Sequence, residues 1–145
     1  MSRILAACAL LLALGAGALL ALGAAAGAQE TASTCREGEP ALSAQLLFGL
    51  SRRDGRPIPE SAWRRFLAAR ITPLFPDGLT VIAGHGQWRG AAGRLRAERT
   101  RIVLVVAEDR PETLAALNAI RDAYRAAFAQ EAVGLVLSPA CASFR

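Results

Sequence analysis

The chain has 145 residues, of which 20% are charged, and its formal net charge of +5 comes from 17 arginines and no lysine, against 12 acidic residues. This length suits one domain with a hydrophobic core and is too short for two ordinary domains. The arginines alternate with acidic residues and form no basic run interleaved with aromatic side chains, so the charge argues against a nucleic-acid-binding protein.

The first 28 residues have the features of a secretory signal peptide. Arg3 is their only charge, an alanine-, leucine- and glycine-rich stretch follows, and the small-x-small tripeptide that ends at Ala28 is typical of a signal-peptidase site. The sequence therefore predicts export to the periplasm or the medium, with a mature chain that begins at Gln29 and leaves the membrane. The alternative is a retained anchor, because the uncharged stretch is long enough to span a bilayer.

Cys8 would leave with the signal peptide, so the exported chain keeps two cysteines, Cys35 and Cys141, near its two ends. An oxidising compartment favours a disulfide between them. Closing so long a loop stabilises a fold by about 4 to 5 kcal/mol through chain entropy. The alternative is a redox-active thiol pair, which usually needs a C-x-x-C-like spacing that this sequence lacks.

Residues 29–44 are polar and contain Gly38 and Pro40, so we expect an extended lead-in outside the core, followed by one domain over residues 45–145. Residues 45–51, QLLFGLS, predict a strand that is apolar on both faces. Residues 52–59, RRDGRPIP, predict a loop with an Asp-Gly turn, whose arginines either hold an anion or are simply solvated.

A first helix is predicted after Pro59, which suits a helix start. Five apolar residues follow at helical spacing and predict a face that packs on the core, while Pro73 ends or kinks the helix. These residues are Trp63, Phe66, Leu67, Ile71 and Leu74.

A long hairpin is predicted next, from the Pro-Asp-Gly turn at Pro76 to Arg101, with a second turn at residues 90–93, GAAG. If the connection has an even length centred on Ala91 and Ala92, the opposed pairs are His85 with Glu98, Gln87 with Arg96, Trp88 with Leu95 and Gly84 with Arg99. An odd-length loop or a bulge would change this register.

The second hairpin strand continues into residues 102–106, IVLVV, a run that requires burial on both faces. Either the chain ends or a second copy of the protein must then cover the sheet face away from the helices, and we expect a two-fold homodimer. A second helix follows residues 109–111, with an inward stripe, and residues 133–137 form a last strand. The stripe consists of Leu114, Leu117, Ile120, Tyr124 and Phe128.

The order strand, helix, strand, strand, helix, strand predicts an α+β fold, the ferredoxin-like βαββαβ sandwich, with a four-stranded antiparallel sheet and two helices on one face. The alternative is a three-layer arrangement in which the chain end adds an element across the open face.

Several of these segments together resemble the family of bacterial exported proteins called domain of unknown function 3574. The resemblance covers about Gln45 to Phe144, and it implies one compact exported domain without implying a reaction. Its motif positions in this sequence are Gly49, Ser51, Phe75-Pro76-Asp77-Gly78, Gly86-Gln87-Trp88-Arg89, Glu98 and Cys141. His85 falls outside them.

Two hypotheses about function follow. The first is a non-catalytic module that binds a small molecule or a protein partner at the polar end of the hairpin through Gln87, Trp88, Arg89 and Arg99. The second is a cofactor-independent enzyme in which Glu98 orients His85 as a general base; the simpler interpretation of this pair is a surface contact. A single histidine and two paired cysteines do not predict a metal site, and glycine-rich phosphate or dinucleotide motifs are absent.

Overall fold

A computed structural model describes residues 35–145 except Ala91. The predicted signal peptide and residues 29–34 of the lead-in lie outside the described residues. Within the described part, no helix has the length and apolar character needed to cross a membrane.

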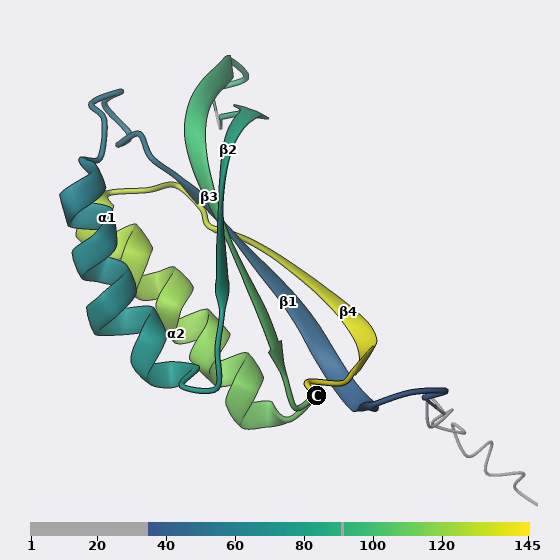
Figure 1. Cartoon of the computed structure of the whole chain (residues 1–145). Helices are drawn as coiled ribbons and strands as arrows, with labels where there is room; N and C mark the ends of the chain where they lie inside the picture. Colours follow the sequence, from purple (N-terminus) through teal and green to yellow (C-terminus); the bar gives the residue numbers. More distant parts are fainter. Residues whose placement is uncertain (1–34, 91) are drawn as a thin grey trace, which may run out of the picture. The chain divides into compact units, whose positions relative to one another are not determined.

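The chain forms four strands and two main helices in the predicted order. The elements are β1 (Glu39–Gly49), α1 (Glu60–Phe66), β2 (Thr80–Arg89), β3 (Leu95–Ala107), α2 (Pro111–Phe128) and β4 (Gly134–Ala142). The strands pair antiparallel in the order β2-β3-β1-β4, and both helices pack on one face of the sheet (Figure 1). The predicted ferredoxin-like fold is confirmed.

The core lies between the helices and alternate residues of the two central strands. On β1 these residues are Leu42, Ala44, Leu46 and Phe48, and on β3 they are Val103 and Val105. An aromatic cluster closes the core, in which the ring of Phe48 lies 5.0 Å from Trp63 and 4.7 Å from Tyr124 between centroids. Such tilted and edge-on aromatic pairs add to the burial of their own area.

The first strand begins earlier than the sequence analysis predicted. β1 starts at Glu39, and Leu42 and Ala44 are buried, so the last part of the predicted lead-in belongs to the core. The alternation from Leu42 to Phe48 is continuous, and Pro40 lies close enough to the strand end that its missing N–H is tolerated.

Two leucines predicted to face the core are exposed. Leu74 follows a π-helical turn (Leu67–Ile71) and lies in a 3₁₀ turn (Thr72–Leu74), which together move it off the helical stripe, and it is 46% exposed. Leu114 is 41% exposed because Thr113 takes the inward position, with its hydroxyl donating to the Glu108 carbonyl at 2.8 Å.

The predicted hairpin register is wrong by one residue. His85 lies opposite Arg99, and Glu98 lies opposite Gly86, so the four predicted pairs do not form. The connecting loop runs from Gly90 to Arg94, an odd length, and Gly93 has a positive φ of 77°. A shift of one residue changes the face to which each side chain points, so His85 and Glu98 occupy positions on opposite faces of the hairpin.

The predicted disulfide is confirmed. Cys35 and Cys141 are bonded, with their Cα atoms 5.6 Å apart, and the bond joins the segment before β1 to β4. Gly38, with a φ of 77°, lies so close to the Ala142 backbone that a Cβ atom would not fit there. The disulfide therefore ties the two ends of the described chain to one end of the sheet.

Removing this bond by the paired change Cys35→Ser and Cys141→Ser should lower the free energy of unfolding by about 4 to 5 kcal/mol, because the bridged cysteines are 106 residues apart. Urea unfolding measures the loss. A reductant should lower the urea midpoint of the native protein and leave that of the double variant unchanged. A double variant that keeps the native urea midpoint would contradict the prediction.

Candidate functional site

The site begins where β1 leaves the sheet. Gly49 is the last residue of β1 paired with β3, opposite Thr100, and the Leu50 N–H then donates to the Arg99 carbonyl at 2.9 Å. The next donor, the Ser51 N–H, finds no strand carbonyl and instead donates to Oε2 of Glu98 at 2.9 Å. The Glu98 side chain thus supplies the acceptor for the first backbone donor beyond the end of the strand ladder.

Gly49 is required at this position for steric reasons. A Cβ atom there would collide with the Glu98 carboxylate, whose Cδ atom would lie 2.7 Å away. The absence of a side chain on Gly49 therefore lets the carboxylate approach the strand and reach Ser51.

The Gly49 carbonyl is held from the other side by α2 and the α2–β4 connection. It accepts hydrogen bonds from the Tyr124 hydroxyl at 2.8 Å and from Nε2 of Gln130 at 3.4 Å. The Gln130 amide also donates to the Ser51 carbonyl. Residues of β1, β3, α2 and the α2–β4 connection therefore meet at this point.

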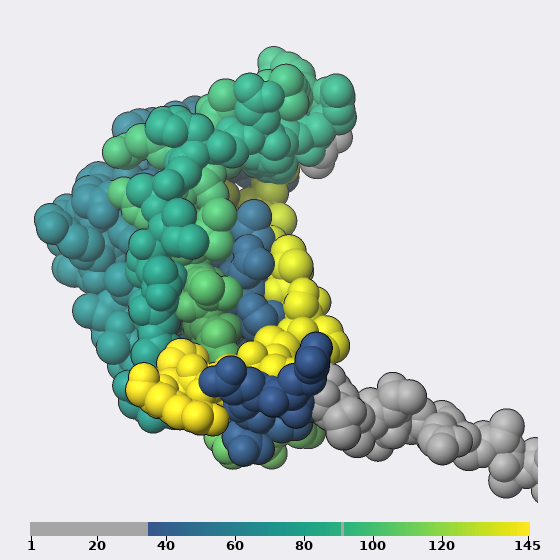
Figure 2. Space-filling view, turned by 45° about the vertical axis from the view of Figure 1, so that its right-hand side comes forward, coloured from purple at the N-terminus to yellow at the C-terminus, as the bar shows by residue number. Residues whose placement is uncertain are grey.

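The β2–β3 hairpin curves over this junction, and Figure 2 shows its tip projecting beyond β1 and β4. Two hollows lie beneath and beside it, and both are lined by Trp88, Glu98 and Gln130. The first, of about 270 Å³, is mostly apolar and is also lined by Leu47, Gly49, Gly86, Gln87, Thr100, Ala132 and Gly134. We call it the indole hollow.

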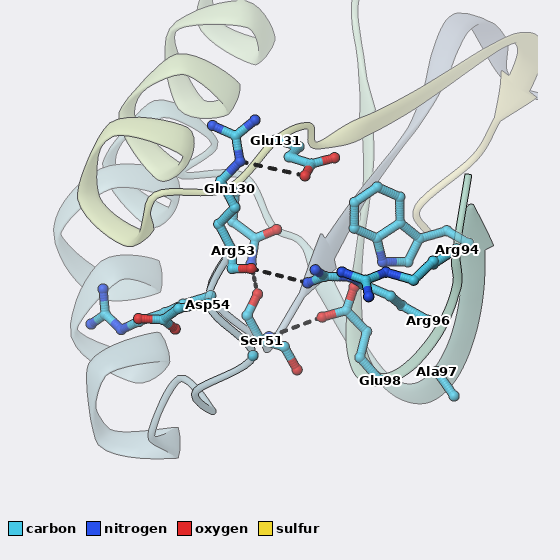
Figure 3. Close-up of a pocket in the computed structure, with 12 residues that line it drawn as sticks. Ser51, Arg53, Asp54, Arg94, Arg96, Ala97, Glu98, Gln130 and Glu131 are labelled. Carbon is cyan, nitrogen blue, oxygen red and sulfur yellow. Dashed lines mark hydrogen bonds and ion pairs between the residues drawn. The ribbon is translucent and has the colours of Figure 1, made fainter. Parts of the chain in front are cut away.

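The second hollow, of about 520 Å³, is charged, and its lining includes residues 51–55, Arg94, Arg96, Ala97 and Glu131. Figure 3 shows the hairpin arginines facing the Ser51 loop and Glu131 across it. Nε of Arg53 lies 3.5 Å from the Glu131 carboxylate, and Arg96 donates to the Arg53 carbonyl at 3.1 Å. These contacts fasten the loop to the hairpin, and four arginines and three acidic residues surround the hollow.

Trp88 carries the one buried side-chain polar atom that lacks a hydrogen-bond partner among the described residues, its indole Nε1. Leaving a buried donor unpaired costs about 1 to 3 kcal/mol, so native structures normally supply an acceptor. A water molecule or a ligand in the adjoining hollows can supply it, because the indole ring lines both.

The structure distributes the residues that the sequence analysis grouped as a binding site over two hollows, which share Gln87, and the hairpin loop. Gln87 and Trp88 line the indole hollow. Arg89 instead donates to the Gly93 carbonyl at 2.6 Å and so braces the hairpin loop. Arg99 lies with His85 on another hollow of about 450 Å³, which Gln87 and Glu98 also border.

The predicted His85–Glu98 contact does not form. Within the described chain no hydrogen bond or ion pair joins the two side chains, and the hydrogen bond of Glu98 goes to Ser51. The described residues also contain no group of three or more histidine, cysteine or acidic side chains that could hold a metal ion.

Sequence reasoning missed Gln130, Glu131, Arg94 and Arg96, which line the hollows only because distant segments meet. Arg53 belongs to the loop whose arginines the sequence offered as a possible anion site. One signal was present in the sequence. Gly49, Ser51, Gly86, Trp88 and Glu98 are positions of the family motifs, and the fold brings all five to this junction.

The fold and the site together define a ferredoxin-like α+β domain with a tryptophan-lined hollow under its hairpin. The model of the family described as "Protein of unknown function (DUF3574)" matches residues 43–144. The chain belongs to this family. A search of curated proteins found no match.

Among solved structures, the chain is similar in fold to a phage SAM lyase. The complex of that enzyme with S-methyl-5′-thioadenosine is 18% identical, with a TM-score of 0.57, over 75% of this chain and 97% of the other. Its apo state is 18% identical, with a TM-score of 0.55, over 77% and 98%. CutA1 from Oryza sativa is 8% identical, with a TM-score of 0.48, over 74% and 85%. At these identities the likeness to the lyase supports the fold alone.

Changing Gly49→Ala should lower the free energy of unfolding by about 1 to 3 kcal/mol, because the new methyl group displaces Glu98 and leaves the Ser51 N–H without its acceptor. Chemical denaturation measures the change. Gly84→Ala is the matched control, since a Cβ there meets nothing within 4 Å.

In a Glu98→Ala background the Gly49→Ala cost should largely vanish, because the clashing carboxylate is gone. Additive costs for the two substitutions would contradict this account of Gly49.

The raised pKa of the Tyr124 phenol should make the free energy of unfolding depend on pH in alkaline solution. Burial raises the pKa of this phenol above the ordinary value of 10.0, and the Glu98 charge raises it further. The folded protein therefore keeps the proton at pH values where the unfolded chain loses it. Stability is fully present below pH 10 and falls as the pH rises above it, by up to about 1.4 kcal/mol per pH unit.

The chain has one tyrosine and no lysine, and arginine stays charged in this range, so Tyr124 dominates the alkaline titration of residues 29–145. Urea midpoints measured from about pH 8 to about pH 12 should fall steeply in the native protein and stay nearly flat in Tyr124→Phe. An equal alkaline loss in the phenylalanine variant would contradict the assignment.

Proposed function

We propose that this domain is a non-catalytic module that binds a small ligand in the indole hollow. The observation that carries the proposal is the buried indole N–H of Trp88, which has no acceptor among the described residues and belongs to the wall of the hollow. A ligand that supplies the acceptor recovers the free energy that the unpaired donor costs.

The lining favours a flat, partly apolar ligand with both an acceptor and a donor. Trp88 and Leu47 offer apolar surface to a ring, the indole N–H offers a donor, and Glu98 offers a carboxylate. The volume of about 270 Å³ lies just below the range of about 300 to 1,000 Å³ for ligand pockets, which favours a compact molecule.

The alternative hypothesis, a cofactor-independent enzyme that uses His85 and Glu98, loses its geometric premise. The register places these residues at positions on opposite faces of the hairpin, and Glu98 already holds the Ser51 N–H. We therefore favour binding over catalysis.

Two nucleosides, S-methyl-5′-thioadenosine and adenosine, are suitable first probes. The first occupies a solved structure of similar fold, that of the phage SAM lyase. Adenine also has the required chemistry, with ring nitrogens that accept hydrogen bonds beside an amino group that donates them. A library of small heteroaromatic compounds extends the test beyond adenine.

The test uses the indole resonances of the protein in nitrogen-15 NMR spectra. The chain has two tryptophans, Trp63 in the core and Trp88 in the hollow, so one spectrum contains both the probe and its control. A ligand should shift the Trp88 indole resonance and leave that of Trp63 in place.

Trp88→Phe keeps an aromatic ring and removes the donor, so it should weaken binding about five- to tenfold, equivalent to about 1 kcal/mol. Undiminished affinity in this variant, or a library in which no compound shifts the Trp88 resonance, would overturn the proposal. Chemical conversion of a bound probe would contradict its non-catalytic part.

A further inference from the structure

The sheet face away from the helices carries an uncovered apolar stripe. Because side chains alternate along a strand, the neighbours of the buried valines Val103 and Val105 point to this face. The open-face stripe consists of Ile82 on β2, Ile102, Leu104 and Val106 on β3, Leu47 on β1 and Val136 on β4. Ile82 is 46% exposed and Val136 is 47% exposed.

The residues between the members of the stripe carry no charge. On the same face lie Ser43, Gln45, Thr80, Thr100, Ser138 and Ala140, and the acidic Glu98 and Glu39 lie beyond them, toward opposite ends of the sheet. By contrast, the exposed side of α2 includes Glu112, Asp122 and Arg125. A soluble monomer seldom exposes a continuous uncharged apolar patch of this kind, so the stripe calls for a partner.

The described chain ends do not cover the stripe. Residues 39–44 and 138–142 are strands of the sheet itself, and Phe144 is 86% exposed. Figure 2 shows the two described ends side by side at one end of the sheet, where the disulfide joins them.

We propose that a second copy of this chain packs on the open-face stripe, related to the first by a two-fold axis. Residues near such an axis meet their own counterparts, so a charged stripe would repel itself, whereas this uncharged stripe matches itself. A strongly charged partner would find no opposite charge here.

The area predicts a weak dimer. Four strands about 4.8 Å apart and about seven residues of each strand give a contact of about 450 Å² per copy, below the roughly 800 Å² per partner of a standard interface. We therefore expect a dimer whose dissociation constant is on the order of micromolar or higher, so that it dissociates on dilution.

The structure also decides which residues test this interface. Val103→Arg would place a charge in the core, because Val103 is 0% exposed beneath the helices. Ile82 and Val136 are the better choices, since both are exposed on the stripe and neither lines the indole hollow.

The experiment measures mass by sedimentation equilibrium over about 10 μM to 1 mM of exported protein, a range that brackets a weak interface. Mass spectrometry first establishes its N-terminus. The mass should rise from one chain to two. Ile82→Arg and Val136→Arg should each weaken association at least about tenfold without lowering the urea midpoint.

Leu114→Arg is the matched control, because Leu114 is 41% exposed on α2, away from the stripe, and this variant should associate like the native protein. The proposal is overturned by a single-chain mass throughout, or by association that both stripe variants retain. It is also overturned if the purified protein keeps residues 1–28, stays monomeric, and associates only after these residues are removed. Residues 1–28, and not a second copy, would then be the partner of the stripe.

Discussion

The hydrogen bond from the Ser51 N–H to the Glu98 carboxylate is the interaction on which the site depends. At the end of a central strand the next backbone donor must find an acceptor, and a side chain from the neighbouring strand supplies it. This arrangement requires a glycine at position 49, and it holds the loop after β1 against the hairpin. Both hollows lie around that fixed point.

The junction also connects the site to the core. Tyr124 belongs to the aromatic cluster and at the same time donates to the Gly49 carbonyl, so the packing of α2 fixes the backbone that carries the site. Most buried polar side chains near the junction have a partner within the chain. The indole N–H of Trp88 is the exception, and an unmet donor in an otherwise satisfied, rigid setting is a feature of binding sites rather than of cores.

The indole hollow and the open-face stripe lie on the same side of the sheet. Leu47 belongs to the open-face stripe and to the lining of the indole hollow, and Thr100 lies beside the stripe and also lines the hollow. A second copy on the stripe would therefore lie next to the hollow. Ligand binding and self-association would then influence one another, because a bound ligand would change the contacts of the second copy. The two processes remain distinguishable, because Trp88 is the probe for ligand binding and Ile82 and Val136 are the probes for self-association.

The sequence by itself determined the element order, the fold class, the disulfide and most of the core, because alternation and helical spacing are local patterns that burial enforces. Tertiary structure decided the hairpin register, which depends on one residue in the loop between Arg89 and Leu95. That single step separated His85 from Glu98. Tertiary structure also decided the site, since Gln130 and Ser51 are 79 residues apart. No local sequence pattern indicates that a carboxylate, an amide and an indole will meet where one strand ends.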